Sequence, residues 1–248
     1  MTRGLVAVWL AALMIFGAFP GIDLWVAGLF FDPETGSFPL ADSAVLEFLR
    51  DLVWNAANLA TLTAFIFGTF ALLATRATAV PGRVWGFALL LILLGPVLLV
   101  NGVLKHYWGR ARPADTDHFG GQYPFTPAWE FAGNCPSNCS FVSGEAAAVT
   151  CLAIFIGLLL WRQVADKRAL LLALGALIVL AAGLRVAKGR HYISDAIWSV
   201  LLMLTLAHVL AARMGLAAHL DKLTWPAIRR DGARIVAACR AWGRSWLG

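Results

Sequence analysis

Six long apolar runs without a single charged residue dominate this sequence of 248 residues. A helix needs about 20 apolar residues to cross a hydrocarbon core roughly 30 Å thick. The chain is 60% hydrophobic and 14% charged, whereas soluble domains are about 45–50% apolar and about 25% charged. The runs therefore predict an all-α integral membrane protein with six transmembrane helices in a bundle. They are Gly4 to Ile22, Leu52 to Thr75, Val84 to Leu104, Ala146 to Trp161, Ala169 to Leu184 and Ala196 to Ala212.

The distribution of positive charge predicts how this bundle is oriented. The first run has a signal peptide as its alternative, because Arg3 precedes it, but its uncharged stretch is long and no small-residue cleavage site follows Pro20. Read as a helix, it gives six spans, which place both termini on one side. That side holds 13 of the 20 Lys and Arg residues. The positive-inside rule then predicts cytoplasmic termini in a bacterial inner membrane.

Residues 1–215 form the predicted membrane domain, and residues 216–248 form a basic amphipathic cytoplasmic tail that is not an independent domain. In this tail, apolar residues at helical spacing alternate with arginines, which is typical of a helix lying on an anionic inner leaflet. Binding to a partner helix is the alternative. The net charge of +6 follows from this arrangement, so nucleic acid is not expected as a partner. The sequence leaves the oligomeric state open.

Two long connections face outward. Residues 23–51 predict a short interfacial helix followed by a turn. Residues 106–142 are rich in Gly, Pro and aromatic residues, and they contain Cys135 and Cys139. We expect these two thiols to form a disulfide, because the outer compartment is oxidising; two free thiols are the alternative.

Charged residues stand at the outer ends of four of the runs. Lys105 ends the third run, Glu145 precedes the fourth, Arg185 ends the fifth, and Asp195 begins the sixth. Alternating topology places all four at the same membrane face. Charges are costly in lipid, so we expect these side chains to face the bundle interior or a wet cavity and to interact there.

Cations outnumber acids at this predicted face. The basic side chains are Lys105, Arg110, Arg112, Arg185, Lys188 and Arg190, joined by His191. Such an excess calls for a bound anion. Arginine forks match tetrahedral oxyanions, and Ser143 and Gly144 at a helix start would offer backbone N–H groups, so a phosphate ligand is predicted. Arg110, Lys188 and Arg190 are possible substrate contacts, and solvated or headgroup-facing positions are their alternative.

His191 and Asp195 are four residues apart, which is about one helical turn. The carboxylate can then hold one ring nitrogen and leave the other free to attack phosphorus. The product would be a phosphohistidine that water resolves. The sequence contains no ligand set for a metal ion, so neither a metal nor another cofactor is expected.

Three motifs in order resemble the signature of the type 2 phosphatidic acid phosphatase family, the membrane branch of the acid phosphatase and vanadium haloperoxidase superfamily. They are Lys105-x6-Arg112-Pro113, Ser143-Gly144 and Arg185-x5-His191-x3-Asp195. The resemblance implies a metal-independent phosphohydrolase with a helical core. It also implies that Lys105, Arg112, Arg185, Ser143 and Gly144 bind phosphate, that His191 is the nucleophile, and that Asp195 orients it.

Two positions depart from the family pattern. Pro-Ser-Gly-His reads Val142-Ser143-Gly144-Glu145 here, and Leu184 replaces the Ser that usually precedes the third-motif Arg. The missing His is the residue taken to protonate the leaving group in the family. Three readings stay open: Glu145 is the acid, His106 substitutes for it, or Glu145 forms a structural salt bridge.

A site at the membrane boundary favours a substrate anchored in the same leaflet. The predicted function is therefore a lipid phosphatase, a phosphoric monoester or pyrophosphate hydrolase, acting at the periplasmic face. Lipid A and undecaprenyl pyrophosphate are the favoured substrates, with phosphatidylglycerol phosphate and phosphatidic acid also possible. The alternative is a noncatalytic protein that binds or translocates lipid phosphates. A vanadate-dependent peroxidase fits less well, because the chain lacks room for a large soluble helical body.

Overall fold

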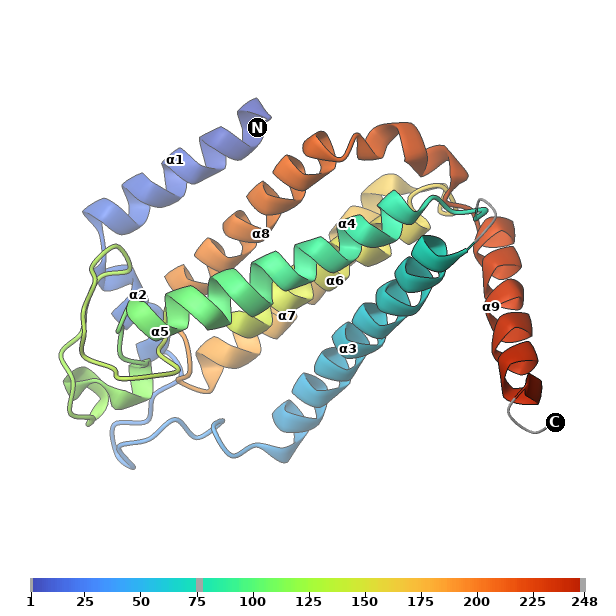
Figure 1. Ribbon diagram of the computed structural model, residues 1–248. Helices are drawn as coiled ribbons and strands as arrows, with labels where there is room; N and C mark the ends of the chain where they lie inside the picture. The colour runs from blue at the N-terminus through green and yellow to red at the C-terminus, as the bar shows by residue number, and fades with distance from the viewer. Residues whose placement is uncertain (1, 75–77, 246–248) are drawn as a thin grey trace.

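The computed structural model describes residues 2–74 and 78–245, and every regular element in these ranges is helical (Figure 1). Thr75, the predicted end of the second run, Arg76 and the last three residues of the predicted tail lie outside them. Four described helices are long and apolar enough to cross a membrane. The first is α3 (Ala44–Leu73). The second is one continuous helix made of α4 (Gly82–Ile92), η1 (Leu93–Leu104) and α5 (Lys105–Tyr107). The other two are α7 (Lys167–Ala187) and α8 (Ile193–Arg213).

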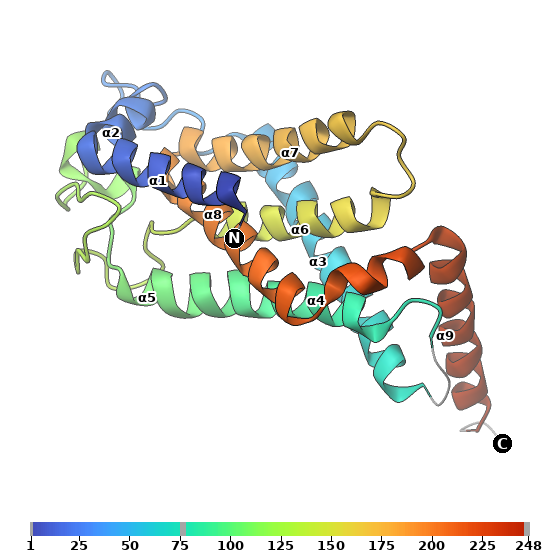
Figure 2. The same cartoon turned by 90° about the horizontal axis from the view of Figure 1, so that it is seen from above.

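A fifth candidate span is bent. Helices α1 (Arg3–Ala18) and α2 (Gly21–Gly28) together are apolar enough to cross, but they meet at 85°. Pro20 lies at the break, and proline has no N–H with which to continue a helix. The first run is thus not the straight helix that its apolar length suggested. As a result, α2 turns toward the loops at one end of the bundle (Figure 2).

The fourth predicted span, α6 (Gly144–Leu160), is shorter than the first four candidate spans and packs against all of them. Its 17 residues extend about 26 Å at 1.5 Å per residue, so its crossing of the membrane stays a prediction. In Figure 2 it lies between α4 and α7, and it also packs against α3, η1 and α8. Small buried residues, among them Ala146, Ala147 and Thr150, let these neighbours approach closely.

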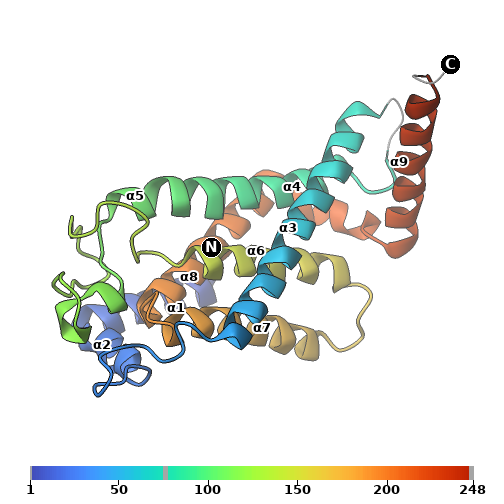
Figure 3. The ribbon, with the colours of Figure 1, turned by 90° about the horizontal axis from the view of Figure 1, so that it is seen from below.

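Helix α3 begins earlier than the apolar run implied. Ser43 caps it by accepting a hydrogen bond from the Leu46 N–H at 3.4 Å, so residues 44–51 are helical and do not belong to an outer loop. The short helix expected in this connection is present as α2. Figure 3 shows α3 crossing the bundle obliquely, from α7 at the end with the long loops to α9 at the opposite end. This brings the first turns of α3 beside the starts and ends of the other helices.

Helix η1 has π-helical geometry and contains Pro96. The side-chain amide of Asn101 donates to the Pro96 carbonyl at 2.7 Å, one turn before Lys105. Gly95 permits close packing here, because a Cβ at that position would lie 2.5 Å from the Met203 sulfur on α8. The start of η1 is thereby packed closely against α8.

The two ends of the bundle differ. One carries the long loop with the short helices η2 (Pro113–Asp115) and η3 (Asp117–Phe119), and we call it the loop end. The other carries η4 (Leu216–Lys222) and α9 (Trp225–Ser245), so the predicted tail is helical over its described part. Asp231 of α9 accepts hydrogen bonds from the backbone N–H groups of residues 79 and 80, at 2.9 and 2.8 Å.

Candidate active site

The residues predicted to converge lie at the loop end of the bundle. Lys105 follows η1, Ser143 and Gly144 start α6, and Arg185 lies in the last turn of α7. His191 is in the short connection between α7 and α8, and Asp195 is in the first turn of α8. Four helix ends therefore contribute to one region, as the boundaries of the apolar runs predicted.

Lys105 lies against the N-terminus of α6. A Cβ on Gly144 would be 3.3 Å from the Lys105 Nζ and 3.1 Å from the Asn101 Oδ1. Ser143 caps the helix by accepting from the Ala146 N–H at 3.3 Å. The ammonium group and the positive end of the helix dipole thus face the same space, which favours an anion there.

Two further cations of the predicted phosphate site, Arg112 and Arg185, repel each other electrostatically. Arg112 is half-buried and donates from Nη2 to the Asn138 carbonyl at 2.8 Å. Burial lowers the pKa of the Arg112 guanidinium, and the charges of Arg190 and Arg185 act in the same direction. Like charges that disfavour one another in this way are relieved when an anion binds. We call Lys105, Arg112, Ser143, Gly144 and Arg185 the phosphate cradle.

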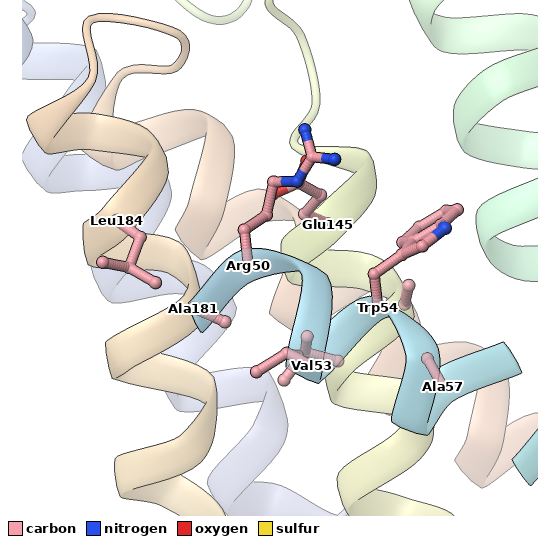
Figure 4. Close-up of a pocket in the computed structure, with 9 residues that line it drawn as sticks. Arg50, Val53, Trp54, Ala57, Glu145, Ala181 and Leu184 are labelled. Carbon is pink, nitrogen blue, oxygen red and sulfur yellow. The ribbon is translucent and has the colours of Figure 1, made fainter. Parts of the chain in front are cut away.

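Glu145 lies at the rim of the phosphate cradle. Its Oε2 is 3.1 Å from the Arg185 Nε, an ion pair that is not aligned as a hydrogen bond. Figure 4 shows the side chains of Glu145 on α6 and Arg50 on α3 lying next to each other. Arg50 itself pairs with Glu47 at 2.6 Å and with Asp51 at 2.8 Å. Glu145 therefore has the salt bridge considered from the sequence, and it also borders the cavity described below.

His191 is held by a backbone carbonyl. Its Nδ1 lies 2.8 Å from the Ser140 oxygen, and because a carbonyl only accepts, Nδ1 carries the hydrogen and Nε2 keeps the lone pair. Burial lowers the pKa of His191 to about 4; Asp195 opposes this shift, whereas the charges of Lys105 and Arg185 reinforce it. The imidazole is consequently neutral near pH 7, the form in which it can attack phosphorus.

The predicted hydrogen bond between His191 and Asp195 is not formed. Their closest atoms, Nδ1 and Oδ2, are 3.8 Å apart. Oδ2 of Asp195 instead accepts from the Ser140 hydroxyl at 2.5 Å and from the Tyr192 N–H at 2.9 Å, and Oδ1 accepts from Arg110 at 2.6 Å. The carboxylate therefore reaches the imidazole through Ser140, which bonds both residues.

The structure corrects two of the four possible substrate contacts. Arg110 is fully buried and its guanidinium pairs with Asp23 and Asp195. The N–H groups that would bind a substrate therefore bind these two carboxylates. Lys188 is also buried, and its Nζ donates to Glu47 at 2.5 Å.

The other two possible contacts are on the surface. Arg190 is exposed beside the phosphate cradle, where its charge acts on Arg112. His106 is exposed and packs edge to face against Tyr107, with ring centroids 4.7 Å apart.

Three residues of the site escaped prediction. Asp23 was placed in an interfacial connection, although an acid within the apolar stretch of residues 21–31 is a signal of a buried partner. Glu47 was assigned to a loop, although Ser43 four residues earlier is a helix-start signal. Ser140 carries no signal of its own, because its role depends on where the loop backbone runs.

The two cysteines of the long loop, Cys135 and Cys139, are joined by a disulfide with a Cα–Cα distance of 5.7 Å. This closes the loop beside Asn138, the residue that holds Arg112. Within the described residues, no three His, Cys, Asp or Glu side chains gather as metal ligands.

A cavity of about 550 Å³ opens next to the phosphate cradle. Its polar end is lined by Arg50, Asn101, Lys105 and Glu145. The remainder runs between α3, η1 and α6 and is mainly apolar, with Ala57, Ile92, Val97, Leu152 and Phe155 among its lining residues. A ligand that fits this space has a charged group at one end and apolar parts beyond it.

Comparison with known proteins agrees with the motifs. The sequence profile of the PAP2 superfamily matches residues 83–217, a range that contains the whole phosphate cradle, His191 and Asp195. A lipid A 4′-phosphatase of Rhizobium leguminosarum is 37% identical over 206 residues, which cover 77% of this chain and 86% of that protein.

Two further relatives carry the same name. One from Rhizobium etli is 36% identical, covering 75% of this chain and 77% of its own length; one from Francisella tularensis subsp. novicida is 29% identical, covering 75% and 83%. No solved structure matches the chain. Its profile match and its relatives show that the chain belongs to the PAP2 superfamily, as a type 2 phosphatidic acid phosphatase family member and a phosphoric monoester hydrolase.

Proposed function

We propose that this protein is a membrane lipid phosphatase that removes a phosphate group from lipid A. One observation carries the chemistry: a neutral imidazole, His191, is fixed by its Nδ1 hydrogen beside the cations of the phosphate cradle. The cavity that opens next to these cations has apolar side chains beyond its charged end, which supports a lipid rather than a soluble ester. The three relatives named lipid A 4′-phosphatase support lipid A over the isoprenyl pyrophosphate that the sequence also allowed.

The proposed reaction has two displacements. In the first, the lone pair of the His191 Nε2 forms a bond to phosphorus while the bond from phosphorus to the sugar oxygen breaks. Glu145 delivers a proton to that oxygen, so the dephosphorylated lipid leaves as an alcohol. In the second, Glu145 takes a proton from water, the water oxygen attacks phosphorus, and the bond to His191 breaks to release inorganic phosphate.

The phosphate cradle stabilises charge on the non-bridging oxygens in both displacements. Lys105 and the N–H groups at the start of α6 would bind these oxygens together with Arg112 and Arg185, whose charges act on Lys105. Because these groups are in place before substrate arrives, little reorganisation is required during the reaction. We place this site at the periplasmic face, on the basis of the excess of Lys and Arg on the opposite side of the chain.

The test is phosphate release from purified lipid A by the full-length protein in detergent, with EDTA present. We expect the wild type to release one phosphate per lipid, and the mass spectrum of the product identifies the position. His191→Ala should be inactive, whereas His208→Ala, on α8 away from the site, should keep wild-type activity. Activity that survives His191→Ala would contradict the mechanism, and a protein that binds lipid A without releasing phosphate would be a binder or a translocator.

A further inference from the structure

A buried chain of polar contacts connects α2 to the proposed nucleophile, and most of it lies outside the family motifs. Asp23 accepts from the Arg110 Nη2 at 2.8 Å. The Arg110 Nη1 donates to Asp195 at 2.6 Å. Asp195 then accepts from the Ser140 hydroxyl, and the Ser140 carbonyl accepts from His191. Each of these five residues is 1% exposed or less.

The Arg110 side chain is held firmly within this series of polar contacts. Besides the two carboxylates, it donates from Nε to the Thr126 carbonyl at 2.9 Å, and its guanidinium stacks 4.2 Å from the centre of the Tyr192 ring. Burial alone would lower the pKa of Arg110, but the charges of Asp195 and Asp23 raise it above its ordinary value. A planar fork held in this way fixes the carboxylate that it contacts.

Asp23 is fixed equally well from the other side. Its Oδ1 accepts from the Ser194 N–H at 2.9 Å, and its Oδ2 accepts from the Ser194 hydroxyl at 2.5 Å. Ser194 directly precedes Asp195. The first turn of α8 is therefore held at two adjacent residues, Ser194 by Asp23 of α2 and Asp195 by Arg110, which limits how Asp195 can turn.

We propose that Asp23 and Arg110 are positioning residues that orient His191 for attack on phosphorus, acting through Asp195 and Ser140; this rests on the function proposed above. Neither residue touches substrate, because both are enclosed. The Asp23–Arg110 pair sets the position of Asp195. Asp195 in turn positions the Ser140 hydroxyl, and the Ser140 carbonyl sets the plane of the imidazole.

The test uses Asp23→Asn in the full-length protein, with lipid A as substrate and inorganic phosphate as competitive inhibitor. The amide places a donor where only acceptors fit, so the Arg110 fork shifts. We expect kcat to fall about 10- to 100-fold while KM changes less than about twofold. The inhibition constant of inorganic phosphate should stay at the wild-type value, because the phosphate cradle is untouched.

Asp231→Asn is the matched control. Asp231 is also 1% exposed and accepts two backbone N–H bonds, but at the opposite end of the bundle. Arg110→Lys is the second variant and carries the test if Asp23→Asn yields no folded protein. It keeps the charge but loses the fork, and the same loss of kcat with unchanged phosphate affinity is expected.

The outcomes separate two failures. If His191→Ala is inactive but both positioning variants match the wild type, this inference is overturned and the proposed function stands. A parallel loss of kcat and phosphate affinity, or an equal loss in Asp231→Asn, also overturns it, because the effect is then general instability. A wild-type protein that releases no phosphate overturns the proposed function, and this inference with it.

Discussion

The acid side of the pH–rate profile is the sharpest test of the environment of His191. Burial lowers the pKa of this histidine to about 4, against about 6.5 for an unperturbed one. The imidazole must be neutral to attack, so activity is lost as pH falls through the pKa of the folded protein. At pH 5.5 the neutral fraction is about tenfold larger with the lower value than with the higher one.

The assay is kcat/KM for phosphate release, measured from pH 3.5 upward in detergent, because kcat/KM reports the pKa values of the free enzyme. Ionisation of the substrate phosphate is shared by all variants, so the informative quantity is the displacement of the acid limb between variants. The Asp195 charge raises the pKa of His191, and the Lys105 charge lowers it. We therefore expect Asp195→Asn to move the limb to lower pH and Lys105→Gln to move it to higher pH.

Two results would refute this reasoning. One is an acid limb that stays at the wild-type pH in both variants, which would mean that the titrating group does not respond to these charges. The other is a limb that moves in the same direction in both variants, which would mean that the titrating group is not the one lying between these charges. Lower maximal rates in either variant are expected and decide nothing about the limb.

Three further predictions concern the surroundings of the nucleophile. Glu145→Gln should lower kcat about 100-fold if this carboxyl transfers the proton. An unaffected kcat would leave the ion pair with Arg185 as the role of Glu145. Gly144→Ala should raise KM several-fold, because the new methyl would lie 3.3 Å from the Lys105 ammonium. Gly183→Ala should leave KM unchanged, because no atom lies within 4 Å of its Cβ position. Equal KM values in the two variants would argue against the phosphate cradle. Replacing Cys135 and Cys139 by Ser should lower the melting temperature in detergent, in line with about 2 kcal/mol for a short loop, and an unchanged temperature would show that the bridge adds no stability.

The apolar runs predicted the helices well because the hydrophobic effect acts on continuous stretches of chain. Each of the six runs is helical over most of its described residues, although the first is broken at Phe19 and Pro20. Helix boundaries were harder. The start of α3 at Ala44 depends on the Ser43 cap and on packing rather than on hydropathy, and the 85° bend at Pro20 depends on where α2 finds its partners.

The closeness of Lys105, Gly144 and Arg185 was predictable because these residues lie at helix ends at one end of the bundle; their binding of phosphate stays a prediction. Contacts between residues far apart in the sequence were not predictable. The four-residue spacing of His191 and Asp195 suggested a direct bond, but Asp195 satisfies closer donors, namely Arg110, Ser140 and the Tyr192 N–H. Such competition is decided by loop backbone geometry, which local spacing does not encode.

The contact between α2 and α8 has a consequence for biogenesis. Ser194 lies 171 residues after Asp23, and translation delivers the N-terminal segment first. Asp23 and Arg110 are therefore synthesised before the serine and aspartate that complete their cluster. Docking of α8 brings Ser194 and Asp195 to these early charges, so the buried cluster is complete only after the last long apolar helix is in place.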